Sequence, residues 1–308
     1  MRLASARRRH PSLRAAQADD RDDRIVSLPP EDPRQRWSSL DQTARDAAYD
    51  NNAAVADSPR WIERRNRDSA AYRSAHNARL DLPYADVSER TAFDLYPSAD
   101  ATAPCLIFLH GGYWQRNSRE AFACVAEGPN AAGWSVAIPG YSLAPQASLA
   151  DIVAEIGRAI DWLALHKREY GICGPLVIAG WSAGAQLAAF HLGHPAIVAG
   201  LAVSGVYDLA PLRETGLNNA LKLSETEIET LSPLRLVPAA KPLTIAYGDE
   251  ELPALVHDSL KLFAMRQALG VTGTILPVAG VDHFSILPEF QKADGVLVKA
   301  AIELLSHV

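Results

Sequence analysis

Short apolar segments alternate with amphipathic segments from about residue 100 to the end of the chain. This alternation predicts a mostly parallel sheet flanked by helices, because parallel strands need long crossover connections that are usually helical. The predicted strands are 105–109, 135–138, 176–179, 201–203, 243–247 and 274–278, and the predicted helices are 118–131, 148–168, 183–192, 254–269 and 289–306.

The segment 148–168 has the clearest helical period. Isoleucine and leucine recur there at spacings of three and four, which places them on one helix face toward the sheet. The apolar face carries Ile152, Ile156, Ile160 and Leu163, and the polar face, which we expect to contact water, carries Asp151, Glu155 and Lys167.

The rest of the chain predicts one α/β domain over residues 37–308 with additions before and within the sheet. We expect 37–76 to be helical with a break at Asn51-Asn52, and 79–96 to form an antiparallel pair of strands. The polar, helix-prone insertion 208–241 interrupts the alternation. Insertions between late strands often lie over an active site, so a small helical cap is one prediction for it, and a surface excursion without a role in binding is the other.

The first 36 residues differ in composition from the rest. Residues 1–24 contain seven arginines and four aspartates and lack the apolar core of a secretory signal. A disordered leader is predicted for 1–36, with an upstream start codon or an Arg-rich targeting peptide as alternatives.

Composition and charge exclude several classes of protein. The 308 residues are 48% hydrophobic and 21% charged, with a net charge of −6, which argues against nucleic-acid binding. The stretch 170–207 has no Asp, Glu, Lys or Arg, but seven glycines and two prolines interrupt it, so a membrane span is not expected. Three unpaired cysteines indicate reduced thiols and a cytoplasmic location.

A nucleophilic serine is predicted at Ser182. The sequence Gly180-Trp181-Ser182-Ala183-Gly184 follows the predicted strand 176–179 and precedes the predicted helix 183–192, as a nucleophile elbow requires. Glycines two residues before and after the serine allow the sharp turn that exposes its hydroxyl. The alternative is an ordinary glycine-flanked turn of a nucleotide-binding protein.

An oxyanion hole is predicted in the run His110-Gly111-Gly112-Tyr113-Trp114, directly after the strand 105–109. Backbone N–H groups of Gly111, Gly112 and Tyr113, together with that of Ala183, would stabilise the oxyanion formed when serine attacks a carbonyl. We expect His110 to organise this loop rather than to act as a base.

The base and the acid should follow the last strands. His283 lies a short loop after strand 274–278 and is the candidate general base. Three carboxylates compete after strand 243–247, in Gly248-Asp249-Glu250-Glu251. A Gly-x-x-acid pattern favours Glu251, with Asp249 as the second candidate and Glu250 as the third.

These motifs resemble the α/β-hydrolase superfamily and, within it, the kynurenine formamidases (arylformamidases), whose oxyanion signature is H-G-G-Y-W. The likeness extends over about residues 40–306 and includes Ala48-Tyr49-Asp50-Asn51-Asn52, which is similar to a Tyr-Asn element of that family, and Glu251-Leu252-Pro253. The elbow departs from many members by having Trp181 in place of His. The resemblance implies a Ser182-His283-Glu251 triad, no cofactor or metal, and N-formylkynurenine or another N-acyl aromatic amine as substrate.

Aromatic residues at the predicted strand ends, together with Tyr49 of the Tyr-Asn element, provide candidates for a pocket that binds a small aromatic amide or ester. A short-chain carboxylesterase or arylesterase is the alternative function, and a non-catalytic binding protein on the same scaffold is the rival from another class. A homodimer is compatible with the sequence. The candidate substrate-binding residues are Trp114, Trp181, Tyr141, Phe284 and Tyr49.

Overall fold

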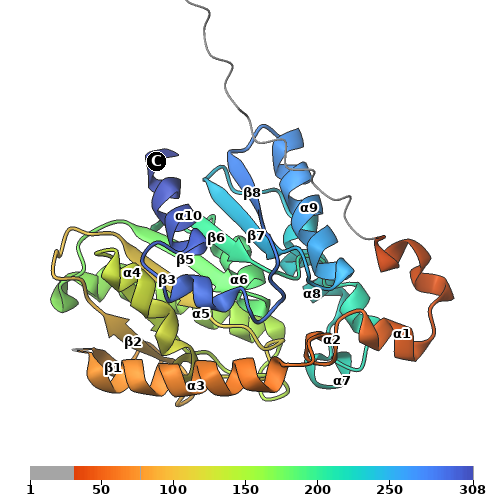
Figure 1. The fold of residues 1–308 in the computed structure, drawn as a ribbon, viewed down its shortest axis with the longest axis horizontal. Helices are drawn as coiled ribbons and strands as arrows, with labels where there is room; N and C mark the ends of the chain where they lie inside the picture. The colour runs from red at the N-terminus through yellow and green to blue at the C-terminus, as the bar shows by residue number, and fades with distance from the viewer. Residues whose placement is uncertain (1–30, 77, 308) are drawn as a thin grey trace, which may run out of the picture.

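The computed structural model of the chain describes residues 31–76 and 78–307 and contains an eight-stranded sheet (Figure 1). The strand order is β1-β2-β4-β3-β5-β6-β7-β8. The pairs β1-β2 and β2-β4 are antiparallel, and every pair from β4 to β8 in this order is parallel. The strands are β1 (Arg79–Pro83), β2 (Ala92–Tyr96), β3 (Cys105–Leu109), β4 (Ser135–Pro139), β5 (Leu176–Trp181), β6 (Ile197–Val203), β7 (Leu243–Gly248) and β8 (Gly273–Val278).

The predicted parallel strands and the predicted antiparallel pair are confirmed. The largest difference is in β6, which begins at Ile197, four residues before its predicted start. Gly200 lies within this extension, where a glycine lowers the strand propensity of the sequence. A Cβ at Gly200 would come within 3.0 Å of the side chains of Leu192 and Leu243, so close packing explains the glycine.

Helices cover both faces of the sheet, and three predicted helical segments are divided. In 37–76 a short helix begins at Asn51, so the expected break at Asn51-Asn52 is wrong and the breaks lie at 48–50 and 55–57. Segment 118–131 is a 3-10 helix followed by a short α-helix, and segment 289–306 is interrupted before Val296. The α-helices are α1 (Gln42–Ala47), α2 (Asn51–Ala54), α3 (Ser58–Ala75), α4 (Glu127–Ala131), α5 (Leu149–His166), α6 (Ala183–His191), α7 (Asn218–Leu221), α8 (Glu225–Leu231), α9 (Pro253–Ala268) and α10 (Val296–Leu304). The 3-10 helices are η1 (Pro33–Ser39), η2 (Arg119–Ala126), η3 (Lys167–Tyr170), η4 (Pro211–Glu214), η5 (Pro233–Arg235), η6 (Leu287–Phe290) and η7 (Leu305–His307).

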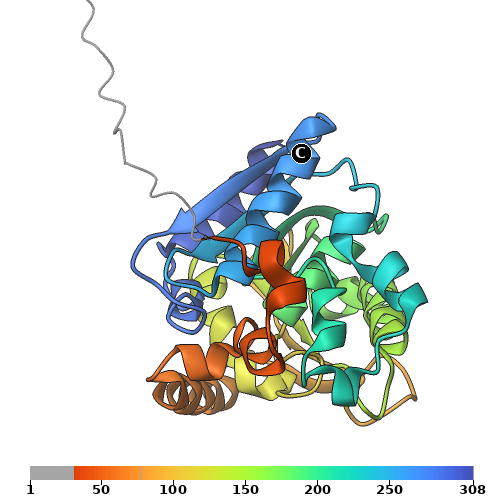
Figure 2. The ribbon, with the colours of Figure 1, turned by 90° about the vertical axis from the view of Figure 1, so that its right-hand side faces the viewer.

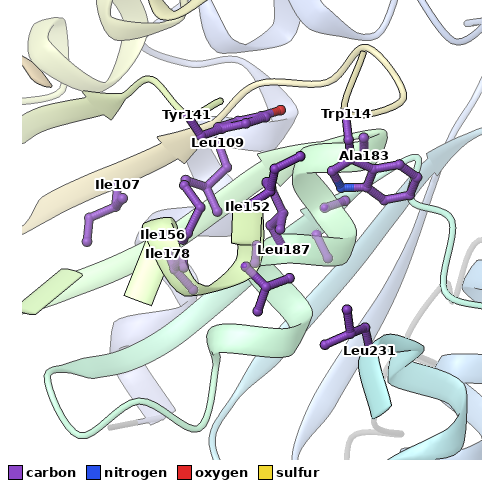
Figure 3. Close-up of a cluster of buried hydrophobic side chains, with 14 of the residues drawn as sticks. Ile107, Leu109, Trp114, Tyr141, Ile152, Ile156, Ile178, Ala183, Leu187 and Leu231 are labelled. Atoms are coloured by element: carbon purple, nitrogen blue, oxygen red, sulfur yellow. The ribbon is translucent and has the colours of Figure 1, made fainter. Parts of the chain in front are cut away.

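The core lies in two layers, one on each face of the sheet. Helices α5, α6 and α9 pack on one face, and α3, η2 and α10 pack on the other. Figure 3 shows the first layer, where Ile152 and Ile156 of α5 face Ile107, Leu109 and Ile178 of the sheet. The apolar face predicted for α5 is therefore correct.

The prediction that Glu155 of α5 contacts water is wrong. Its side chain is 1% exposed and accepts a hydrogen bond of 2.7 Å from the backbone N–H of Ser142. The carboxylate thus satisfies a donor of the loop after β4, which a helical period cannot reveal because the partner lies on another element.

Residues 31–36, which the sequence analysis includes in the leader, are packed on the fold through Asp32 and Arg34. Asp32 is 2% exposed and forms ion pairs with Arg34 and with Lys261 of α9. Arg34 also pairs with the buried Asp258 of α9. Residues 1–30 of the predicted leader lie outside the described residues.

The insertion 208–241 forms η4, α7, α8 and η5, and it contacts the segment before α3. The N–H of Gly216 donates to Asp46 of α1 at 2.7 Å, and Arg45 pairs with Glu214. Accordingly, α2 and α7 lie together at the lower right of Figure 1, and Figure 2 shows α1 in front of the sheet. No helix in the described part of the chain is both long and apolar enough to cross a membrane.

Candidate active site

Ser182 lies in a strained turn between β5 and α6. Its backbone has φ 58° and ψ −122°, a region that residues with a Cβ rarely adopt. The flanking glycines are required by contact: a Cβ at Gly180 would lie 2.0 Å from the carbonyl of Gly184, and one at Gly184 would lie 2.0 Å from that of Leu109. The turn therefore needs small residues at both positions to present the hydroxyl at the end of the sheet.

His283 and Glu251 complete a chain of three buried side chains with Ser182. The distance between His283 Nε2 and Ser182 Oγ is 3.1 Å, and the distance between His283 Nδ1 and Glu251 Oε2 is also 3.1 Å. The other oxygen of Glu251 accepts from Ser204 Oγ at 2.5 Å and from the N–H of Gly248 at 2.8 Å. These bonds fix the carboxylate so that it orients the imidazole toward the serine.

The two competing carboxylates of this loop lie away from His283. Asp249 accepts a hydrogen bond of 2.7 Å from the N–H of Gly280, and both Asp249 and Glu250 are exposed. The carboxylate in contact with the imidazole is that of Glu251, the residue that the Gly-x-x-acid pattern favoured.

The glycine run after β3 lies directly against Ser182. A Cβ at Gly111 would be 2.8 Å from Ser182 Cβ and 2.7 Å from the ring of Trp181. Within the described residues, the amides of Gly112, Tyr113 and Ala183 donate to no backbone carbonyl. These donors are available for an oxyanion formed at Ser182, as proposed from the sequence.

Tyr113 connects the glycine run to the Tyr-Asn element near the N-terminus. Its backbone has φ 52°, and its hydroxyl donates to the carbonyl of Tyr49 at 2.6 Å and accepts from Asn51 Nδ2 at 3.0 Å. Two segments more than 60 residues apart in sequence are thereby joined beside the serine.

His110 is buried and neutral. Burial lowers its pKa to about 3, and Nδ1 faces the carbonyl of Gly111 at 2.9 Å. Its ring stacks on Tyr141 with centroids 4.2 Å apart. These contacts agree with a role in organising the loop.

A cavity of about 410 Å³ opens beside Ser182 and His283. This volume lies within the usual range for small-molecule sites. Among the predicted substrate-binding residues, Tyr49, Trp181 and Phe284 line it, and Tyr113 of the glycine run does so as well. Trp181 also donates from Nε1 to the carbonyl of His283 at 2.9 Å, which couples the cavity wall to the imidazole.

Two predicted pocket residues, Trp114 and Tyr141, do not line the cavity. Both are 0% exposed, and Figure 3 shows them among the aliphatic side chains of the core. The hydroxyl of Tyr141 donates to the carbonyl of His110 at 2.7 Å. Their large rings bury more apolar area beneath the loops than they would at the surface of the cavity. The two rings therefore stabilise the fold.

Several residues of the site were not assigned to it from the sequence, and apart from Asp50, Asn51 and Asn52 of the Tyr-Asn element no local motif marks them. Ser204 has φ 55° after β6 and bonds Glu251. The remaining cavity residues come mainly from the chain before α3, from α3 and from the insertion. The additional lining residues are Asp46, Asp50, Asn51, Asn52, Ile62, Arg65, Arg116, Asn117, Thr215, Gly216 and Leu217.

Comparisons with known proteins agree with this geometry. The BD-FAE family model matches residues 93–194. Kynurenine formamidase of Danio rerio is 28% identical over 249 residues, which cover 76% of this chain and 84% of the fish protein. Kynurenine formamidase of Salmo salar is 29% identical and covers 73% of this chain and 81% of its own length.

Solved structures give the same fold. A protein of Silicibacter sp. tm1040, described as a candidate thioesterase, is 26% identical with a TM-score of 0.75 over 83% of this chain and 98% of its own. Esterase LipW from Mycobacterium marinum has a TM-score of 0.66 at 18% identity over 88% of this chain and 96% of its own. The chain is a serine hydrolase of the α/β-hydrolase fold. The predicted fold class, the hydrolase activity and the likeness to kynurenine formamidases are confirmed.

In this hydrolase, no group of three or more His, Cys, Asp and Glu side chains within residues 31–76 and 78–307 has the arrangement of a metal site. The reacting groups that lie together at the cavity are a hydroxyl, an imidazole, a carboxylate and free backbone amides. This set matches nucleophilic acyl transfer through a covalent acyl-enzyme.

Proposed function

We propose that the hydrolase removes a formyl group from aromatic amines, with N-formylkynurenine or a close analogue as substrate. The likeness to kynurenine formamidases supports this substrate class. The observation that carries the proposal within the site is the cavity of about 410 Å³ beside Ser182 and His283, whose lining includes the aromatic rings of Tyr49, Trp181 and Phe284. This aromatic lining suits an aromatic leaving group next to the nucleophile.

The proposed mechanism uses Ser182, His283 and Glu251 as a triad. Ser182 Oγ attacks the formyl carbon while His283 Nε2 accepts its proton, and the amides of the glycine run and of Ala183 stabilise the oxyanion. Collapse of this intermediate breaks the C–N bond, and the protonated imidazole donates its proton to the leaving aromatic amine. Water then attacks the formyl-enzyme by the same route, which releases formate and restores the serine.

The aromatic wall of the cavity, with Tyr49, Trp181 and Phe284, would hold the leaving amine. A short-chain arylesterase is the second candidate, because the solved esterases have the same fold and a triad can cleave both amide and ester bonds. The cytoplasmic location and the homodimer stay predictions from the sequence.

The deciding experiment compares kcat/KM for N-formylkynurenine, the matching N-acetyl amide and phenyl acetate. We expect the formamide to be the best substrate and the acetamide to be at least about 10-fold slower, because one added methyl in a tight pocket is worth about 1–3 kcal/mol. Ser182→Ala should fold normally and lose about 10⁶ in kcat on all three. Faster turnover of the ester than of the formamide would reassign the hydrolase to the esterases.

A further inference from the structure

Arg65 of α3 is a buried cation on the wall of the active-site cavity. It is 7% exposed and lines the same cavity as Ser182. Its Nη2 donates to Asn66 Oδ1 at 2.9 Å and to Asn117 Oδ1 at 3.3 Å, and its guanidinium carbon lies 4.2 Å from the centroid of the Phe122 ring. Within residues 31–76 and 78–307 it forms no ion pair, and its Nη1 makes no hydrogen bond.

Two of the other strongly buried arginines are paired with carboxylates, and a third lies away from the cavity. Arg34 is paired with Asp32 and Asp258, and Arg119 is paired with Asp81 and Asp94. Arg266 lies off the cavity and donates to three backbone carbonyls. Arg65 has only neutral amide oxygens as acceptors.

The lack of a carboxylate partner for Arg65 among the described residues has an energetic consequence. Burial lowers the pKa of Arg65 to about 10, so the guanidinium is still charged at neutral pH. A buried charge without an opposite charge destabilises the folded protein, and an anion that enters the cavity would remove that penalty. A guanidinium with a free Nη1 can also bind a carboxylate with charge-assisted hydrogen bonds.

The position of Arg65 places such an anion near the reacting bond. Asn117 Nδ2 donates to the carbonyl of Gly111 at 3.0 Å, and Gly111 lies against Ser182. Arg65 is thus separated from the glycine run by a single side chain.

The charges around the cavity indicate which anion fits. Two carboxylates, Asp46 and Asp50, and two guanidinium groups, Arg65 and Arg116, line it. This balance suits a zwitterion better than a purely anionic substrate. We propose that Arg65 binds the carboxylate of a leaving group that carries an amino-acid moiety, and this inference rests on the proposed function for the identity of the bond that is cleaved.

Direct binding tests the carboxylate site without requiring turnover. Calorimetry would compare kynurenine with its α-carboxamide, which keeps the amine and the ring but removes the negative charge. The wild-type hydrolase should bind kynurenine about 10- to 100-fold more tightly, as expected for one charge-assisted interaction. Arg65→Gln should lose this difference, and Arg65→Lys should recover part of it. Arg67→Gln, at an exposed position of the same helix, is the control and should keep it.

Kinetics separates binding from a role in positioning Asn117. The kcat/KM for N-formylkynurenine is divided by that for its α-carboxamide. Arg65→Gln should lower this ratio by raising the KM for N-formylkynurenine. A parallel fall in kcat for both substrates would overturn the proposal and make Arg65 a positioning residue. Equal wild-type affinity for kynurenine and its carboxamide would also overturn it. Preserved discrimination with no formamide hydrolysis would overturn only the proposed function.

Discussion

The two sides of the active site are built in different ways. The proposed catalytic edge consists of Ser182, Glu251 and His283, which follow β5, β7 and β8 at one end of the sheet. The opposite part of the lining, which we call the cavity wall here, consists of Asp46, residues 49–52, Ile62, Arg65 and residues 215–217, which come from the segments before and within α3 and from the insertion. The catalytic edge is fixed by strand ends and tight turns, whereas the cavity wall is held by contacts between segments that are distant in sequence.

The catalytic edge and the cavity wall should therefore have separate functions, because they are held in place differently. Parallel strands end at the same edge, so reacting groups placed there keep their geometry when other segments change. The cavity wall depends on bonds between segments that are distant in sequence, such as those from Gly216 to Asp46 and from Asn51 to Tyr113. Chemistry should therefore depend on the catalytic edge, and substrate selection should depend on the cavity wall.

After loss of the nucleophile itself, the largest expected effect tests the catalytic edge through its acid. Glu251→Gln should fold normally and lower kcat by about 10⁴, because the carboxylate that orients His283 is lost. Asp249→Asn should keep most activity, since its side chain only accepts a hydrogen bond from Gly280, and should cost about 1 kcal/mol of stability. Steady-state kinetics and thermal unfolding of both variants measure this. The reverse pattern would move the acid to Asp249.

The sequence predicted the catalytic edge far better than the cavity wall, and the reason is physical. The turn at Ser182 requires glycine at Gly180 and Gly184, two residues before and after the serine. The local sequence is therefore enough to predict its geometry. Trp114 and Tyr141 were assigned to the pocket because they follow strands, but whether a ring at a strand end turns inward depends on space that other segments leave. Arg65 lies on a predominantly polar helix with no motif, and only the tertiary structure brings it to the cavity.

The next effect concerns the scaffold under the catalytic edge, where α6 ends at a buried histidine. Burial lowers the pKa of His191 to about 4, and its Nε2 faces the carbonyl of Val153 at 3.0 Å. The unfolded chain has a histidine pKa near 6.5 and binds the proton more readily. The contribution of neutral His191 to the free energy of unfolding is therefore fully present above pH 6.5 and is lost as the pH falls toward about 4.

Urea unfolding at pH 7 and pH 4.5 measures this contribution. The decrease in unfolding free energy should be about 2 to 3 kcal/mol smaller for His191→Gln than for the wild-type protein, because Gln can donate to Val153 without titrating. His110, which is also neutral, should account for part of the remaining decrease. An equal decrease in both proteins would show that His191 is not neutral in the fold.

The smallest expected effect tests whether the cavity wall is separable from the catalytic edge. Asn51 donates to the hydroxyl of Tyr113 at 3.0 Å, and Tyr113 also donates to the carbonyl of Tyr49, so Asn51→Ala removes one of two bonds. A loss of about 1 kcal/mol is expected, which should raise KM by about 5-fold with kcat nearly unchanged.

Asn219→Ala, at an exposed position of α7 outside the cavity, is the matched control and should leave both constants unchanged. If Asn51→Ala lowered kcat about 100-fold at constant KM, the loss would belong to the transition state alone. Asn51 would then act through Tyr113 on the amides that bind the oxyanion, and the N-terminal segment would be part of the catalytic machinery rather than of the cavity wall.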